Sequence, residues 1–157
     1  MSKYYQIVDF YPHLKNPQKY KGTRPLTMRS GWEICYSQYL DQHTAVVEWS
    51  SESIVIPYIS PLDGKLHRYF PDFWYKYLDR EGNYAELLVE IKPYVEKMLA
   101  ESPSPPKRMT KGAIQRIHTA LKNAAKWKYA RHWCEQEQQK ERKIFFTIIT
   151  ENEFPFK

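Results

Sequence analysis

Two apolar runs around a short turn, the first of them rich in aromatic residues, constrain the fold of this chain more than any other feature. The runs cover residues 67–78 and 84–92, and the five residues between them include Gly82. A connection of that length with a glycine is typical of a β-hairpin. The sequence therefore predicts two neighbouring antiparallel strands near the middle of the chain.

The segments around this predicted hairpin indicate helices and further strands. Spaced apolar residues over 30–43 predict a helix, and the β-branched run 53–59 predicts a strand in which Pro57 suggests an edge position or a bulge. A long helix over 110–139 and a buried strand over 144–150 follow. This order predicts an α/β domain in which a mixed sheet is flanked by helices.

The length of 157 residues suits a single domain and leaves little room for a second. Residues 1–28 carry little periodicity and several turn-forming residues, so we expect an irregular N-terminal arm on that domain. Thr110 is a suitable N-cap for the long helix. We expect the buried stripe of this helix to consist of Ile114, Ile117, Leu121, Ala124 and Ala125.

Positive charge is concentrated in the C-terminal half of the chain. The formal net charge is +6, but residues 92–143 hold thirteen Lys or Arg against five Asp or Glu. Such a stretch favours a polyanionic partner, although a solvated helix surface would show the same balance. No apolar run is long enough to cross a membrane, and the two cysteines form no metal-ligand spacing. We therefore expect a soluble protein of a reducing, intracellular compartment, with no membrane partner.

Three charged residues stand where the predicted hairpin would bring them together. Asp72 follows Pro71 within the first strand, and Glu90 and Lys92 end the second. Residues two apart in a strand point to one face, so Glu90 and Lys92 project together. Pairing of the two strands would then place Asp72 within several ångströms of Glu90.

Two carboxylates and an ammonium group suit the hydrolysis of a phosphodiester bond. A divalent cation held by Asp72 and Glu90 would neutralise phosphate charge and lower the pKa of a bound water. Mg²⁺ keeps several of its waters, so one or two carboxylates suffice. Lys92 would hold the water or stabilise the transition state. The alternative is structural: Asp72 caps a turn, and Glu90 with Lys92 forms a solvated strand face.

Three motifs make the chain similar to a known family. Residues 29–33 (RSGWE), 69–73 (YFPDF) and 88–93 (LVEIKP) resemble PD-(D/E)xK nucleases. Within that superfamily, the chain is most similar to the subgroup that contains TnsA-like transposon-end nucleases and the head completion nucleases of T-even-like tailed phages. The resemblance implies a restriction-endonuclease-like fold and endonucleolytic hydrolysis of double-stranded DNA.

The same resemblance implies site residues and a cofactor. Asp72, Glu90 and Lys92 are the expected catalytic set, with Asp72 and Glu90 as ligands of Mg²⁺, for which Mn²⁺ can substitute. An acidic residue is also expected on the first helix, and Glu33 matches it. Glu33 has a structural alternative, because Ser30 and Glu33 form a capping box in which the glutamate reaches back to the Ser30 N–H.

The long helix supplies further candidates for contacts with DNA. Gln115, Lys122 and Lys126 share one flank of this helix, beside the predicted apolar stripe. A solvated flank is the alternative for each of them.

The resemblance also implies a biological setting. This setting is completion of the phage head in the host cytoplasm or in the virion, with phage head or portal-vertex proteins as partners. Two alternatives stay open: a non-catalytic DNA-binding plug of the phage head, and a transposon-end cleavage nuclease. A plug would not require the complete set of Asp72, Glu90 and Lys92. A transposon-end nuclease would need a transposase partner, and no further helical domain follows residue 150 to bind one.

Overall fold

The predicted hairpin forms the centre of the sheet. In the computed structural model, which describes residues 6–156, β4 (Phe73–Leu78) and β5 (Tyr84–Ile91) pair antiparallel. The register places Phe73 opposite Val89. Because β5 lies between two other strands, its last four residues are all buried.

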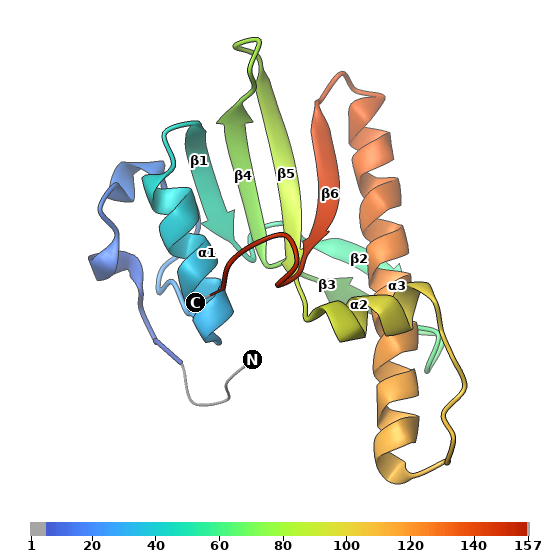
Figure 1. Cartoon of the computed structure of the whole chain (residues 1–157). Helices are drawn as coiled ribbons and strands as arrows, with labels where there is room; N and C mark the ends of the chain where they lie inside the picture. The colour runs from blue at the N-terminus through green and yellow to red at the C-terminus, as the bar shows by residue number, and fades with distance from the viewer. Residues whose placement is uncertain (1–5, 157) are drawn as a thin grey trace.

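The remaining strands complete a mixed sheet of order β1-β4-β5-β6. β1 (Val46–Ser51) pairs antiparallel with β4, and β6 (Ile144–Ile149) pairs parallel with β5. A parallel neighbour requires a crossover, which here contains two helices, α2 (Tyr94–Glu101) and α3 (Lys111–Gln138). Figure 1 shows the four strands side by side, with α1 (Gly31–Gln42) and α3 at opposite sides of the sheet.

The two faces of the sheet carry separate apolar clusters. On one face, α1 packs on a cluster that includes Trp49 and Val89. On the other face, α3 packs on a cluster that includes Leu88, Trp127 and Ile144. Successive residues such as Leu88 and Val89 point to opposite faces, as the strand period requires. The expected fold class, a restriction-endonuclease-like mixed sheet flanked by helices, is therefore confirmed.

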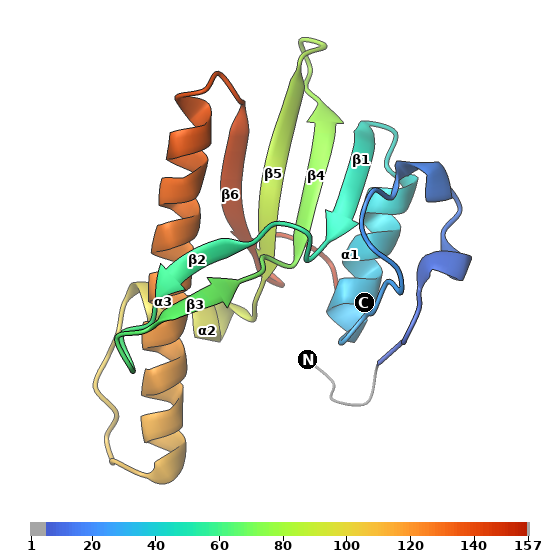
Figure 2. The same ribbon diagram turned by 180° about the vertical axis from the view of Figure 1, so that it is seen from behind.

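Two predicted strands are interrupted. The run 67–78 forms two strands, β3 (Leu66–Tyr69) and β4, separated by a gap that contains Pro71. Proline has no N–H to donate to a strand ladder, so the pairing stops there. The run 53–59 shortens to β2 (Ile56–Ile59), which pairs with β3 in a separate two-stranded sheet. Figure 2 shows this small sheet lying across α3.

Two elements of the structure are absent from the sequence prediction. One is β1, which is followed by Glu52 in a left-handed conformation with a φ of 50°. The other is α2, which begins directly after Pro93. A proline suits the start of a helix, since its missing N–H would have no helical partner there. Only Ala100 of α2 is buried, so this helix contributes little to the core.

The two main helices begin at the predicted caps. Ser30 Oγ accepts the N–H of Glu33, and Thr110 Oγ1 accepts the N–H three residues on. The stripe predicted for the long helix is wrong in part, because Ile114 and Leu121 are exposed. The N-terminal half of α3 extends past the sheet, so mainly its C-terminal half meets the core (Figure 1). The helix buries Ala113, Asn123, Trp127, Ala130 and Cys134.

The prediction of an irregular N-terminal arm covers residues 1–28, of which residues 1–5 lie outside the described residues. The arm contains two short 3-10 helices, η1 (Tyr11–His13) and η2 (Pro17–Lys19). Asp41 of α1 holds it, because the Asp41 carboxylate accepts two consecutive backbone N–H groups of the arm at 2.8 and 2.9 Å.

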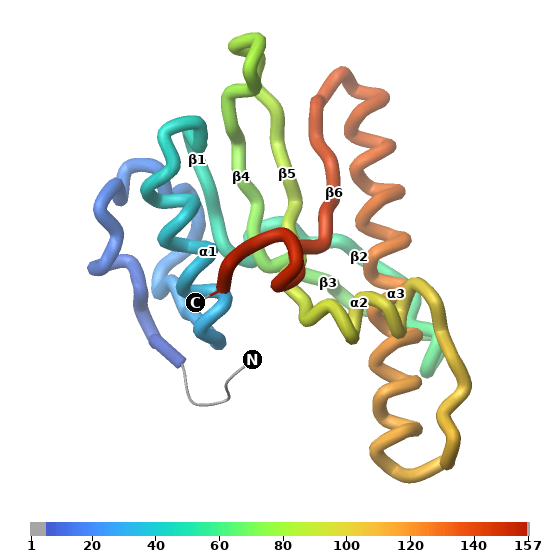
Figure 3. Tube along the Cα trace, in the orientation of Figure 1, coloured from blue at the N-terminus to red at the C-terminus, as the bar shows by residue number. Residues whose placement is uncertain are grey.

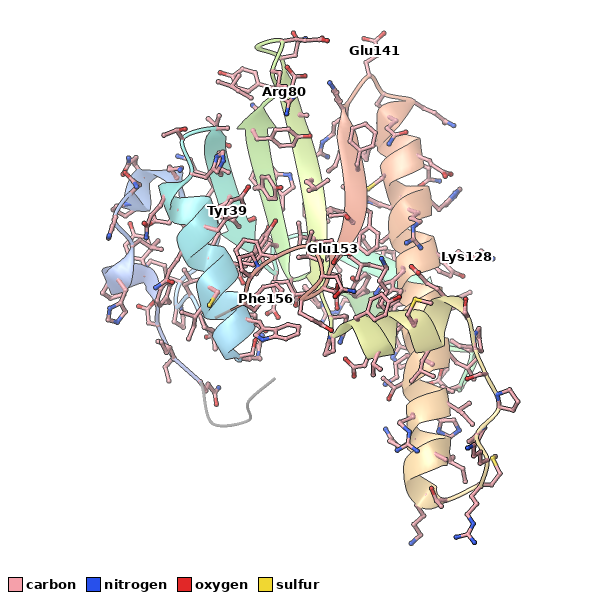
Figure 4. The ribbon with its side chains drawn as sticks, in the orientation of Figure 1. Tyr39, Arg80, Lys128, Glu141, Glu153 and Phe156 are labelled. Carbon is pink, nitrogen blue, oxygen red and sulfur yellow. The ribbon has the colours of Figure 1, made fainter. Side chains whose placement is uncertain are left out.

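The segment after β6 returns across the sheet to α1 (Figure 3). Phe156 stacks on Trp32, with ring centroids 4.5 Å apart and ring planes 7° apart. Phe154 meets the rings of Tyr36 and Tyr39 edge-on. Figure 4 shows Phe156 against α1. No helix in the described part of the chain is long and apolar enough to cross a membrane.

Candidate active site

Asp72 lies directly before β4, at the end of the sheet where β4 begins and β5 ends. It stands in the gap between β3 and β4 and not within a strand, which corrects the sequence prediction. Its Oδ2 accepts the backbone N–H of Ile91 at 2.7 Å. Because Phe73 pairs with Val89, the next position along the ladder places Asp72 beside Glu90. The hairpin register thus brings the two carboxylates together.

Glu90 is buried near the C-terminal end of β5, with 6% of its surface exposed. The Tyr69 hydroxyl donates to its Oε2 at 2.7 Å, and the Lys92 Nζ lies 3.8 Å from its Oε1. Lys92 follows β5, but its backbone N–H still donates to the carbonyl of Ile149 at 3.1 Å. Pairing with β6 therefore holds the lysine on the same side as Glu90.

The pKa values of both carboxyls are raised. Burial raises the pKa of Asp72 well above its usual value, and the charge of Glu90 raises it further. Burial also raises the pKa of Glu90, while Lys92 and the Tyr69 hydroxyl lower it without cancelling the effect. Burial and mutual repulsion therefore disfavour the state in which both groups are ionised. A bound cation would stabilise that state.

Glu33 lies in the first turn of α1 and takes part in capping. Its N–H donates to Ser30 Oγ at 3.2 Å, whereas its Oε2 accepts the N–H of Arg29 at 2.8 Å. The Glu33 carboxylate thus accepts the N–H of Arg29, and not that of Ser30, which the capping box predicts. Burial raises the pKa of Glu33 and Lys92 lowers it, while the Glu33 charge raises the pKa of Asp72. The same carboxylate therefore serves the cap and lies within electrostatic range of the site.

Helix α3 contributes Lys126 to the same centre. The Lys126 Nζ lies 5.6 Å from the ring centroid of Tyr69 and 6.0 Å from that of Tyr58. Burial lowers the pKa of Lys126, and the charge of Glu90 opposes this effect. Lys122 is a neighbour of Lys126, since its charge also lowers the Lys126 pKa.

Gln115 lies away from this centre. It is exposed, and it lines a shallow cavity together with Val95 and Thr119. At about 1.5 Å per residue, it stands about 16 Å along the helix from Lys126. The structure therefore brings Lys126, with Lys122 beside it, to the carboxylates but leaves Gln115 outside.

Three residues around the site were not predicted: Tyr69, Arg29 and Glu52. Arg29 forms an ion pair with Glu52 at 2.5 Å, and the Glu52 N–H donates to the carbonyl of Asp72 at 3.1 Å. Tyr69 and Arg29 stand inside motifs that carry the family resemblance, and that position could have identified them. Nothing in the sequence around Glu52 indicates its place, because it depends on the left-handed turn after β1.

The donor set fits a hard divalent cation. Asp72 and Glu90 supply carboxylate oxygens, and ions of the Mg²⁺ type complete their shell with water. Within residues 6–156, no group of three or more Asp, Glu, His or Cys side chains forms a ready-made metal cluster. Two adjacent carboxylates with raised pKa values are therefore the candidate ligands.

Comparison with known proteins identifies the family. The family model described as "TnsA-like endonuclease N terminal" matches residues 43–151. The head completion nuclease of Enterobacteria phage T4 is 38% identical over 143 residues, with 88% of this chain and 87% of that protein covered. No solved structure matches the chain. Nucleases of this family generally use divalent metal ions. The chain therefore belongs to the TnsA-like endonuclease family and is a DNA endonuclease.

Proposed function

We propose that this endonuclease hydrolyses double-stranded DNA with Mg²⁺ as its metal ion and with Asp72, Glu90 and Lys92 as its catalytic set. One observation carries the proposal. The carboxylates of Asp72 and Glu90, both with raised pKa values, meet where β4 begins and β5 ends, and the Lys92 Nζ lies 3.8 Å from that of Glu90. Mn²⁺ would substitute for Mg²⁺, because it accepts the same oxygen ligands.

Asp72 and Glu90 would hold the metal ion. When bound, Mg²⁺ neutralises charge on the scissile phosphate and lowers the pKa of a coordinated water. The Ile91 N–H orients the Asp72 carboxylate, and the Tyr69 hydroxyl orients that of Glu90. Both ligands are thus positioned by hydrogen bonds of the protein, which is what precise ligand geometry requires.

Other side chains around the carboxylates have supporting roles in this proposal. Lys92 stabilises the negative charge that develops on the phosphate and helps to hold the attacking water. Glu33, in electrostatic range of Asp72 and Lys92, assists in orienting that water. Lys122 and Lys126 contact DNA close to the site, and Gln115 contacts the duplex farther along α3.

We place this activity in the completion of phage heads. The support is the similarity to the phage T4 protein, which is a head completion nuclease. The setting would be the host cytoplasm during assembly, or the virion, with phage head or portal-vertex proteins as partners. Trimming of a DNA end that protrudes from a filled head is one step that requires an endonuclease.

Incubation of the purified protein with linear and supercoiled DNA tests the catalytic proposal. We expect cutting with Mg²⁺ and no cutting with a chelator. Asp72→Ala and Lys92→Ala should abolish cutting, because each removes a charge that the reaction needs. The matched controls are Asp63→Ala and Lys128→Ala, which remove the same charges at exposed positions and should leave cutting intact.

A gel-retardation assay without metal completes this test. Asp72→Ala should bind DNA at least as tightly as the parent, because a negative charge is lost, whereas Lys92→Ala should bind more weakly. Cutting that survives Asp72→Ala or Lys92→Ala would overturn the site assignment. DNA binding with no metal-dependent cutting by the parent protein would favour the non-catalytic plug.

A further inference from the structure

A long segment after α2 carries positive charge only. Residues 102–134 contain eight Lys or Arg and no Asp or Glu. The segment comprises a proline-rich loop and most of α3. The N-terminal half of α3 continues beyond the sheet edge at which β4 begins and β5 ends (Figure 1). Much of this charge therefore lies on a helix that projects from the body of the domain.

Part of the charge forms a stripe along one side of α3. An α-helix turns about 100° per residue, so Lys111, Gln115, Lys122 and Lys126 lie within about 60° of one another around the axis. Between Lys111 and Lys126, no apolar residue falls in that sector. At about 1.5 Å per residue, these four residues, the α3 stripe, span about 22 Å.

One end of the α3 stripe belongs to the candidate active site. Lys126 lies over the ring of Tyr69, whose hydroxyl donates to Glu90. The other end is Lys111, which is exposed in the first turn of α3. The stripe therefore leads from the carboxylates outward along the projecting half of the helix.

The outer cations of the stripe are not neutralised by carboxylates. Within the described residues, no ion pair involves Lys111 or Lys122, whereas Arg131 on the same helix pairs with Glu101 at 3.7 Å. A row of unpaired cations on one line favours a polyanion, because binding replaces mutual repulsion by attraction and releases the counterions of the partner.

The opposite side of α3 has a different character. There Ile117 and Leu121, together with Leu99 of α2 and Pro105 of the loop, line a cavity of about 470 Å³. Protein interfaces have an apolar core, which the α3 stripe lacks. A phosphate backbone instead needs cations and polar donors, which the stripe provides. Polarity and charge therefore favour a nucleic acid over a protein on this side.

We propose that the α3 stripe binds the DNA duplex that flanks the cleaved bond, so that the projecting helix holds the substrate beyond the catalytic centre. This inference rests on the proposed function, because it takes duplex DNA as the substrate. Phosphates recur about every 3.4 Å along one strand, so a stripe of about 22 Å matches about six of them. Contacts of this kind fix the position of the duplex without selecting its sequence.

Fluorescence anisotropy with a labelled duplex of about 30 base pairs, in chelator at several salt concentrations, tests this inference. The test variant is Lys111→Gln/Lys122→Gln. The matched control is Lys128→Gln/Lys140→Gln, which removes the same net charge. Lys128 lies about 200° around the helix from Lys126, and Lys140 follows the end of α3.

We expect the two double variants to differ in the salt dependence of binding. Each phosphate contact contributes about 0.9 to the slope of log Kd against log salt, so the stripe variant should lose about 1.8. Its affinity at low salt should fall about tenfold or more, and that of the control should fall far less. Thermal melting of each variant establishes that it is folded.

Two results would overturn the inference. One is a folded stripe variant that binds DNA with the affinity and salt slope of the parent. The other is an equal loss in both double variants, because then only net charge matters. Since binding is measured without metal, either result leaves the catalytic test untouched: retention of cutting by Asp72→Ala would count against the proposed function alone.

Discussion

Two glutamates on β5, Glu86 and Glu90, stand four residues apart and therefore point to the same face of the sheet. Glu86 accepts hydrogen bonds from Arg142 Nε and Nη2 at 2.7 and 2.6 Å, and from Trp74 Nε1 at 2.8 Å. Burial alone would raise the pKa of Glu86, but these bonds bring it below the usual value. Glu90 has one hydroxyl donor, from Tyr69, and a more distant ammonium group, and its pKa is raised.

The difference separates a carboxylate that stabilises the fold from one that is suited to bind a ligand. The guanidinium of Arg142 balances the charge of Glu86 and also bonds Glu137 at 2.8 Å. Glu90 and Asp72 are buried side by side, and the nearby ammonium groups do not offset the effect of burial on their pKa values. Strongly perturbed pKa values concentrate at functional sites, because a buried carboxylate of this kind is useful there and costs stability elsewhere. One strand thus carries both kinds of glutamate.

Substitution of Glu90 should have the largest effect on cutting. Glu90→Gln removes the charge of a proposed metal ligand, so cutting should fall by about 10²- to 10³-fold. The free energy of unfolding should stay equal or rise, because a buried carboxylate beside Asp72 disfavours the native state. Nicking of supercoiled DNA measures the first effect and urea denaturation the second. A variant that cuts like the parent would contradict the role given to Glu90.

Glu86→Gln should produce the opposite pattern. The free energy of unfolding should fall by about 1–3 kcal/mol, because the partly buried Arg142 loses its charged partner. Cutting by the folded variant should persist. Urea denaturation measures the loss, with the exposed Lys140→Ala as a control expected to cost much less. Loss of cutting without loss of stability would show that Glu86 belongs to the site.

The pH dependence of stability should distinguish Glu86 from Asp72. The native pKa of Glu86 lies below its unfolded value, so its contribution is present above the unfolded pKa and is lost as pH falls through the native one. The native pKa of Asp72 lies above its unfolded value. Its contribution to the free energy of unfolding is therefore present at low pH and is lost as pH rises through the native pKa.

Thermal melting in metal-free buffer measures both effects. Between about pH 5 and pH 3, the Tm of Glu86→Gln should fall less than that of the parent. Above about pH 4, Asp72→Asn should lose less stability than the parent as pH rises. Parallel curves for the parent and both variants would mean that neither carboxyl has a shifted native pKa.

Tyr69→Phe should reduce cutting much less than Glu90→Gln does. It removes the one hydroxyl that orients Glu90, so cutting should slow about tenfold. The hydroxyl also lowers the Glu90 pKa, so the acidic limb of the pH–rate profile should move to higher pH. The control is Tyr84→Phe on the exposed end of β5. An unchanged rate with an unchanged profile would exclude a positioning role for Tyr69.

Local patterns were sufficient to predict the parts of the fold that depend on sequence neighbours. The turn at Gly82 predicted the hairpin, and the strand period predicted that Glu90 and Lys92 project together. The caps Ser30 and Thr110 predicted where two helices begin. Pairing of these two strands predicted that Asp72 lies near Glu90, whereas the interpretation of Asp72, Glu90 and Lys92 as a catalytic set came from the family resemblance.

The rest of the site depends on contacts between distant segments. Lys126 and Tyr69 meet Glu90 because α3 and the small β2–β3 sheet cross near the end of β5, and no local pattern encodes that crossing. The α3 prediction failed for the same reason. Leu121 fits an apolar stripe by its spacing, but this part of α3 extends past the sheet, and the side chain is exposed.

The stack of Phe156 on Trp32 ties the end of the chain to its first helix. Trp32 immediately precedes Glu33, so the final residues brace the backbone that carries this acidic side chain. The segment between residues 32 and 156 is thus closed by aromatic stacking in place of a covalent junction. Loss of the Phe156 ring would therefore loosen the first turn of α1, which carries Glu33, before it disturbed any strand.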